Sequence, residues 1–312
     1  MKLFSENLGS TNSNTELAAL YAQFPDYAQE YLCQATLSWR SDAKKWIEEL
    51  WRQFKPYADS NFLDEFKRQY AQRTWELYLG ATLLSRGFRL GTHNDAGPDF
   101  NIKKDSDKHQ TWIEATTTNR GDGKDKVPDM VYGVVQNVPE EEMMLRIANA
   151  LNKKYAKYSD DLSKGLIKSN EPYIIAINRD RLSYTDGWPP LIIKVLFGIG
   201  HRVLRLTTDG NEHESREWSL TARPRINKRN GKGVPMLFFQ NQEHSSVSAV
   251  IYCVDSILNS PRSPHDMGEN FVIIHNTFAK NPLPDGFFPF GDEYKLVSGE
   301  IKKIREKKEW NM

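Results

Sequence analysis

Apolar residues recur at helical intervals in the first part of the chain and gather in short runs further on. The segments "TELAALYAQFPDYAQEYL" and "SDAKKWIEELWRQFKPYA" predict two helical stretches, broken near Pro25 and Pro56. A longer helix is predicted from about Ser60, a suitable N-cap, to Gly87, a natural C-terminal stop. The first sixty residues are therefore expected to be mostly helical.

The pattern changes after Gly87. Short extended runs flank the turn-forming "KKDSDKHQ", which predicts a hairpin, and "PYIIAIN", "SVSAVIYCV" and "ENFVIIHN" predict buried strands. Between them, "GDGKDKVPDMVYGVVQNV" is typical of a loop, and Pro139 followed by three glutamates predicts a helix from about 140 to 158. The C-terminal "SGEIKKIREKKEW" is expected to be a charged helix or tail. The whole pattern predicts a mixed α/β protein.

Composition agrees with a folded globular chain. With 312 residues, 39% of them hydrophobic and 27% charged, the chain can bury a sizeable core in one domain, or in one domain with a smaller appendage. We expect a helical region over residues 1–59 and a main domain over 60–312. The net charge of +1 argues neither for nor against an anionic partner, because basic groups can concentrate on one face.

Location and cysteine chemistry follow from what the chain lacks. No apolar run approaches the roughly 20 residues that span a bilayer, and the first twenty residues lack the apolar stretch of a signal peptide. A cytoplasmic protein with no membrane partner is the default expectation. Cys33 and Cys253 are the only cysteines, which argues against a disulfide framework and excludes a four-cysteine metal site.

Two acids stand among apolar neighbours, Asp99 in "AGPDF" and Glu114 in "WIEAT". Residues alternate faces along a strand, so Glu114 shares a side with Trp112 and Thr116, and the hairpin can bring Asp99 opposite Glu114. Adjacent buried carboxylates stay ionised only beside a cation, and hard oxygen ligands select Mg²⁺ or Mn²⁺. The alternative is that each acid accepts backbone hydrogen bonds or pairs with a basic side chain.

A third acid belongs to the same hypothesis. Glu76 lies at the helical spacing of Gly80 and Leu84, so we expect it to face inward rather than toward solvent.

Two lysines of the predicted helix 140–158 differ in position. Lys154 lies at the edge of the apolar stripe and is placed to reach an interior site, whereas Lys153 shares a polar face with Arg146 and Lys157. The alternative for Lys154 is a lysine whose stem covers apolar surface while its ammonium reaches water.

A glutamate on a helix is followed by a "PD" pair and then by the acid of "IEAT". Over about residues 60 to 180, this order of residues resembles the PD-(D/E)xK nuclease superfamily. The resemblance implies a restriction-endonuclease-like mixed sheet flanked by helices, with an N-terminal helical extension. One departure is Thr116, which stands where the superfamily pattern has lysine. Some members carry that lysine on the following helix, and "NALNKK" resembles such a position, which implies Lys154.

The resemblance also implies roles for the residues. Asp99 and Glu114 would hold one or two Mg²⁺ ions, or Mn²⁺, with the Ala115 carbonyl as a further ligand and Glu76 completing or flanking the set. Lys154 would orient or help activate the attacking water. The implied activity is Mg²⁺-dependent hydrolysis of DNA in restriction or defence against foreign DNA, with RNA as a substrate and a homodimer left open.

A basic stretch, "RPRINKRNGKGVP" at 223–235, is expected to be a loop that contacts phosphates, together with Lys153. Its basic residues are Arg223, Arg225, Lys228, Arg229 and Lys232.

Other chemistries lack their motifs. The chain has no phosphate-binding glycine loop ending in Lys-Ser or Lys-Thr, no GxSxG and no zinc spacing, and His275 is expected to be a hydrogen-bonded strand residue. Two other classes stay open: a nucleic-acid-binding protein of this fold that no longer cuts, suggested by Thr116, and a protein-interaction module in which the acids are structural.

Overall fold

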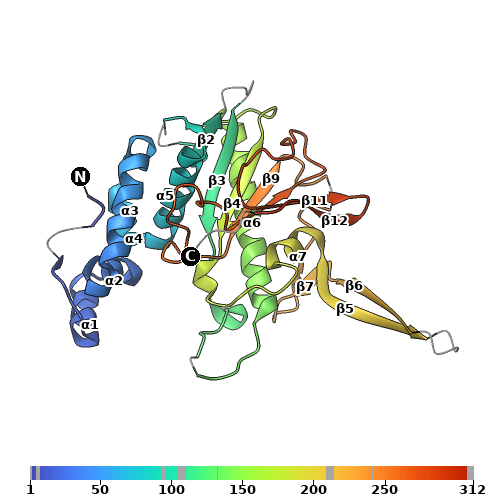
Figure 1. Cartoon of the computed structure of the whole chain (residues 1–312), viewed down its shortest axis with the longest axis horizontal. Helices are drawn as coiled ribbons and strands as arrows, with labels where there is room; N and C mark the ends of the chain where they lie inside the picture. The colour runs from blue at the N-terminus through green and yellow to red at the C-terminus, as the bar shows by residue number, and fades with distance from the viewer. Residues whose placement is uncertain are drawn as a thin grey trace.

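The computed structural model describes residues 2–4, 8–92, 96–103, 110–131, 133–208, 214–240 and 242–307. Its centre is a mixed sheet of eight strands in the order β1-β2-β3-β4-β9-β10-β11-β12 (Figure 1). The β3–β4, β4–β9 and β10–β11 pairs are parallel, and the other neighbours are antiparallel. The strands of this sheet are β1 (Arg89–Leu90), β2 (Phe100–Lys103), β3 (Thr111–Thr117), β4 (Tyr173–Asn178), β9 (Ala249–Cys253), β10 (Phe271–His275), β11 (Asp292–Val297) and β12 (Glu300–Arg305).

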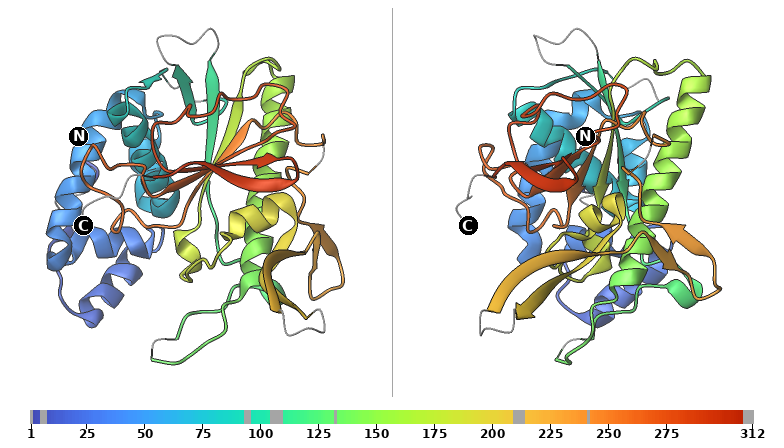
Figure 2. Two further views of the ribbon diagram at one scale, coloured as in Figure 1. Left: turned by 45° about the vertical axis from the view of Figure 1, so that its right-hand side comes forward. Right: turned by 90° about the vertical axis from the view of Figure 1, so that its right-hand side faces the viewer.

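Helices cover both faces of this sheet. The α-helices are α1 (Asn14–Gln23), α2 (Gln29–Thr36), α3 (Ser41–Phe54), α4 (Phe62–Arg68), α5 (Tyr70–Ser85), α6 (Glu140–Ser163) and α7 (Leu191–Phe197). Short 3₁₀ turns are η2 (Ser38–Arg40), η3 (Lys55–Tyr57), η4 (Gly123–Asp125) and η5 (Asp180–Leu182). The right-hand view of Figure 2 shows the sheet between α5 on one side and α6 on the other. The structure thus confirms the predicted class, a mixed α/β fold with a mixed sheet flanked by helices and with helices at the N-terminus.

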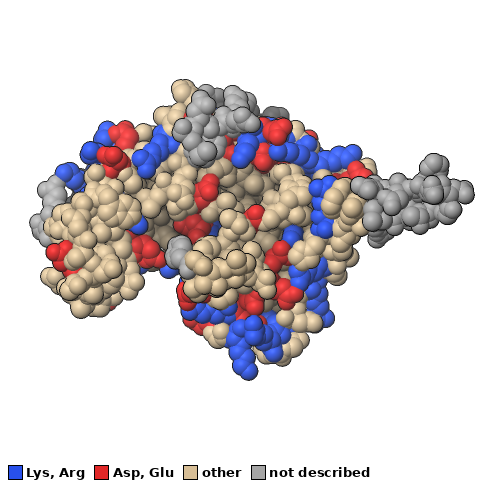
Figure 3. Space-filling view, turned by 60° about the horizontal axis from the view of Figure 1, so that its bottom comes forward, with Lys and Arg blue, Asp and Glu red and all other residues tan. Residues whose placement is uncertain are grey.

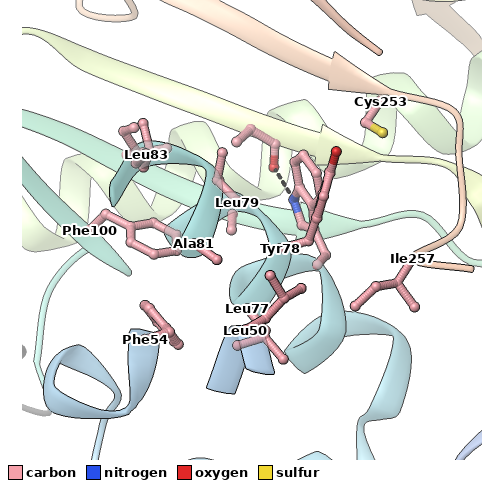
Figure 4. Packing of buried hydrophobic residues seen from close by; sticks show 14 of the residues in the cluster. Leu50, Phe54, Leu77, Tyr78, Leu79, Ala81, Leu83, Phe100, Cys253 and Ile257 are labelled. Carbon is pink, nitrogen blue, oxygen red and sulfur yellow. Dashed lines mark hydrogen bonds between the residues drawn. The ribbon is translucent and has the colours of Figure 1, made fainter. Parts of the chain in front are cut away.

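Strand alternation divides the core into two clusters. Ile113, Ala115 and Ala176 pack with α3, α4 and α5 on one face, whereas Ile175 and Ile177 pack with α6 and α7 on the other. Figure 4 shows the first cluster, in which Leu77, Leu79 and Ala81 of α5 lie among Phe54, Phe100 and Leu50. The Trp75 indole donates to the Ala176 carbonyl at 3.2 Å, which ties α5 to the sheet.

The hairpin that brings the two acids together is present. Phe100 pairs with Ile113 and Ile102 with Thr111 in antiparallel register, so Asp99 comes immediately before the pairing begins, beside Glu114. From β3 the chain passes through α6 to the parallel neighbour β4, with Glu114 opposite Ile175. This β3-α6-β4 unit lays α6 over the face from which Glu114 projects.

Several predicted elements need correction. The helix expected over 60–87 is two helices, because it breaks at Gln69, whose backbone is not helical; the stop at Gly87 is correct, with φ at +82°. Helix α6 begins at Glu140 as predicted but continues to Ser163. The C-terminal segment is not a helix: Glu300–Arg305 forms edge strand β12.

The basic stretch is a hairpin and not a plain loop, since β7 (Arg225–Asn227) pairs with β8 (Gly233–Pro235). A longer two-stranded ribbon, β5 (Ile199–Thr208) with β6 (Glu214–Ala222), was not predicted from sequence and projects from the body of the molecule (Figure 1). In the described ranges, no helix has both the length and the hydrophobicity needed to cross a bilayer.

Candidate metal and catalytic site

A cleft of about 800 Å³ separates the N-terminal helices from α6, and Asp99, Glu114, Glu76 and Lys154 all line it. The sequence-predicted acids and lysine therefore come together, although they stand on four different elements or turns. Figure 3 shows acidic side chains in the depression beside the N-terminal helices. Thr117 and Arg181 also contribute to the wall.

Asp99 sits where the chain turns into β2. Its Oδ2 accepts a hydrogen bond from the backbone N–H of Ala115 at 2.7 Å, which holds the carboxylate against the middle of β3. The preceding turn contains Gly97, whose φ of +89° is unfavourable for any residue with a side chain. Glycine is therefore needed to direct Asp99 into the cleft.

Glu114 is 1% exposed and contacts two lysines of α6. Lys154 Nζ lies 2.5 Å from Glu114 Oε1, and Lys157 donates to Glu114 Oε2. The predicted inward position of Lys154 is thus correct. Lys157, which the sequence pattern placed on the polar face with Lys153, is also a site residue, while Lys153 is exposed.

Glu76 is buried on α5 and faces inward as predicted. Gln72, one turn earlier, donates from Nε2 to Glu76 Oε1 at 2.7 Å and to the Ala115 carbonyl at 3.2 Å. Its Oε1 accepts from the Thr117 N–H at 3.0 Å, so one amide side chain connects α5 to the end of β3.

Arg73 pairs with three carboxylates. Its guanidinium lies 2.6 Å from both Glu76 Oε2 and Asp59 Oδ2 and also contacts Glu65. Burial disfavours the charged guanidinium, but the three acids outweigh it and raise the pKa of Arg73. Arg73 therefore stays charged and partly neutralises the acidic wall of the cleft.

The electrostatics of the acids follow from burial and crowding. Burial, then repulsion from Glu114 and Glu76, raises the pKa of Asp99 well above its ordinary value, against the opposing effect of Lys154 and Lys157. Burial likewise raises the pKa of Glu76, although Arg73 and Gln72 oppose it. Burial alone would lower the pKa of Lys154, but attraction to Glu114 and Asp99 raises it, so the ammonium stays protonated at neutral pH.

The donor set suits a hard divalent cation. Three carboxylates and the Ala115 carbonyl offer oxygen ligands of the kind that Mg²⁺ and Mn²⁺ prefer, and a cation would relieve the repulsion that raises the pKa of Asp99. The described side chains include no group of three or more acidic, histidine or cysteine residues in metal-binding geometry. In this arrangement Glu114 and Glu76 are contacted by the protein's own cations.

Sequence reasoning missed Gln72, Arg73 and Lys157. Lys157 could have been found from its spacing, because residues three apart on a helix share a face and Lys154 was already placed inward. Gln72 and Arg73 carry the same signal with respect to Glu76, because they lie four and three residues before it on the helix. Their contacts with Thr117 and Glu65 carry no such signal, since these depend on how α5 lies against β3 and α4.

The basic stretch is partly neutralised within the molecule. Arg223 pairs with Glu140 at 3.2 Å and with Glu141, and Arg229 lies 3.5 Å from Glu142. Arg225, Lys228 and Lys232 form no ion pair with any other residue that the structure describes. These three side chains are therefore the basic groups of the hairpin that are available to an external anion.

His275 is buried in β10, where its Nε2 lies 2.5 Å from Glu293 Oε1, so the prediction of a hydrogen-bonded strand histidine is confirmed.

Comparison of the chain with protein-family models, curated proteins and solved structures gave no match.

The raised pKa of Asp99 leads to a pH-dependent stability prediction. At pH values above 3.8, the ordinary pKa of an aspartate, the unfolded chain releases the Asp99 proton more readily than the folded protein does. The folded state therefore loses stability as the pH rises from 3.8 toward the pKa that Asp99 has in the folded protein. In metal-free buffer, Asp99→Asn should raise the melting temperature near pH 8, by about 2 °C for each kcal/mol of repulsion relieved. The gain should vanish near pH 3, where both states are protonated.

The measurement is a series of thermal melts in EDTA from pH 3 to pH 8, with the exposed Asp26→Asn as the matched control. Equal destabilisation by Asp99→Asn at every pH would contradict the prediction. It would mean that the pKa of Asp99 is the same in the folded and the unfolded chain.

Proposed function

We propose that the protein is a metal-dependent endonuclease that hydrolyses DNA phosphodiester bonds. The observation that carries the proposal is the convergence of Asp99, Glu114 and Glu76 with Lys154 in one cleft. The β2–β3 hairpin and the β3-α6-β4 unit, which position these residues, also suit a restriction-endonuclease-like fold. A role in restriction or defence against foreign DNA is part of the same proposal.

Each residue has a defined task in this mechanism. Asp99, Glu114 and the Ala115 carbonyl would hold Mg²⁺ or Mn²⁺, with Glu76 completing or flanking the set. The bound cation would neutralise charge that develops on the phosphate and supply hydroxide near neutral pH. Lys154, protonated beside Glu114, would donate a hydrogen bond that orients the attacking water toward phosphorus.

Binding the cation would require some internal pairs to change. Glu114 is contacted by Lys154 and Lys157, and Glu76 by Arg73, so these cations must share or release a carboxylate oxygen when Mg²⁺ binds. Long lysine side chains can do this at low cost because they are flexible and only partly buried, with side-chain exposures of 22% for Lys154 and 35% for Lys157.

A second candidate is a nucleic-acid-binding protein of the same architecture that no longer cuts. Thr116, which is buried, stands at the position where the superfamily pattern has lysine, and both oxygens of Glu114 are engaged by lysines. A site neutralised permanently by its own cations would need no metal. Cleavage assays separate the two candidates.

The first test is plasmid digestion. Wild-type protein should convert supercoiled DNA to nicked or linear products with Mg²⁺ and not with EDTA, because the carboxylates need a cation to act. Glu114→Ala should reduce the rate by at least about a hundredfold, the range found when one transition-state stabilising group is removed. DNA that is bound but never cut, with Mg²⁺ or Mn²⁺, would favour the second candidate.

The second test concerns Lys154. Lys154→Ala should abolish Mg²⁺-dependent cleavage while leaving folding and DNA affinity nearly intact, because its ammonium lies 2.5 Å from Glu114 at the reacting centre. Lys153→Ala should at most weaken binding, since Lys153 is exposed. The assay is single-turnover cleavage together with a DNA-binding titration. If Lys154→Ala still cleaves DNA but Glu114→Ala does not, the result would support the metal site and reject Lys154 as the catalytic lysine.

The third test concerns the basic hairpin. Replacing Arg225, Lys228 and Arg229 by glutamine should weaken DNA binding for all sequences and flatten its dependence on log salt by about one unit per lost phosphate contact. Arg229 should contribute least, because Glu142 already faces it. The matched control is the exposed triple Lys45, Arg52 and Lys55 on α3 and η3, also changed to glutamine. If the hairpin variant and the control variant show the same salt dependence, the hairpin is not part of the DNA-binding surface.

A further inference from the structure

Lys157 makes a contact that Lys154 does not. Its Nζ donates to Glu114 and also to the main-chain carbonyl of Gly97, at 2.8 Å. One turn further along α6, the buried Asp161 carboxylate lies 3.8 Å from the same ammonium, and its Oδ2 has no hydrogen-bond partner among the described residues. The ammonium of Lys157 thus joins α6, β3 and the turn that carries Asp99.

That turn has few other attachments. Strand pairing begins only at Phe100, so the ladder does not hold Gly97 or Asp99. Among the described residues, the hydrogen bonds that hold the turn to the rest of the site are those from Lys157 to the Gly97 carbonyl and from the Ala115 N–H to the Asp99 carboxylate. Without the first of these, Asp99 would be held by the second hydrogen bond and by the packing of its buried neighbours Pro98 and Phe100.

We infer that Lys157 is a positioning residue, which holds the Gly97–Asp99 turn against Glu114 so that the two carboxylates can bind one cation. The inference rests on the proposed function for its metal, whereas the tether itself is a property of the metal-free protein. Lys154, which contacts Glu114 but not the turn, has the catalytic role instead.

Two effects of removing Lys157 act in opposite directions. The loss of a competing positive charge on Glu114 would strengthen cation binding, and the loss of the tether would weaken it. Removing groups that orient metal ligands typically costs 10- to 100-fold in metal affinity. We expect the tether to dominate, because the partly exposed Lys157 side chain can move off Glu114, whereas no other side chain in the described ranges donates to the Gly97 carbonyl.

The experiment compares Lys157→Met with Lys153→Met, which makes the same chemical change on the exposed side of the same helix. Calorimetric titration with Mn²⁺, without nucleic acid, should show affinity reduced about tenfold in Lys157→Met and unchanged in Lys153→Met. In cleavage assays, Lys157→Met should need more Mg²⁺ for half-maximal rate yet approach the wild-type rate at saturation. Lys154→Ala should stay inactive at every Mg²⁺ concentration.

Amide hydrogen exchange in the metal-free proteins supplies a readout that does not depend on the metal. The segment 96–103 should exchange at least about tenfold faster in Lys157→Met than in Lys153→Met, while β4 and β9 keep their protection. Equal exchange in the two variants, tighter Mn²⁺ binding, or loss of cleavage at saturating Mg²⁺ would overturn the positioning role. If the wild type binds no Mn²⁺, the proposed function fails and the exchange comparison alone decides the role of Lys157.

Discussion

The crowding of three carboxylates in one cleft, with Glu76 and Glu114 buried and Asp99 half-buried, is the constraint around which this part of the molecule is arranged. A buried anion without a partner costs several kcal/mol, so each acid must find a cation or a set of hydrogen-bond donors. Glu114 has two lysines, Glu76 has Arg73 and Gln72, and Asp99 has the Ala115 N–H. Asp99 is the least compensated of the three, and it carries the strongly raised pKa.

The compensating groups come from both sides of the sheet. Gln72 and Arg73 belong to α5 on one face, and Lys154 and Lys157 belong to α6 on the other. Glu114 lies on β3, Asp99 lies just before β2 and Glu76 lies on α5, so the cleft that they line takes partners from helices on both faces of the sheet. Stability of the core and geometry of the cleft are therefore linked: a shift of either helix would separate an acid from its partner.

Sequence reasoning recovered what depends on local pattern. Strand alternation placed Glu114 with Trp112 and Thr116, helical spacing turned Glu76 inward, and the border of an apolar stripe selected Lys154 over Lys153. It failed where the outcome depends on packing between distant segments. The hydrogen bond from Lys157 to the Gly97 carbonyl and the pairing of Arg223 with Glu140 join segments far apart in the chain, so no local pattern predicts them.

The β5–β6 ribbon was missed for a different reason. Its strands pair only with each other, so they lack the buried apolar runs by which β4, β9 and β10 were predicted. The C-terminal strand β12 is similar, since as an edge strand with four charged residues it has the composition of a solvated tail.

The N-terminal helices form one wall of the cleft as well as part of the core. Phe4 and Tyr31 stack against each other and pack with Phe66 of α4, and Arg181 beyond β4 pairs with Glu30 of α2. Helix α4 and the start of α5, which carry Glu65, Gln72 and Arg73, therefore rest on residues before position 59. A shortened chain that began at residue 60 would expose this aromatic surface to water and leave the acidic wall of the cleft without its support. The helical region before residue 60 is therefore required for the structure of the cleft.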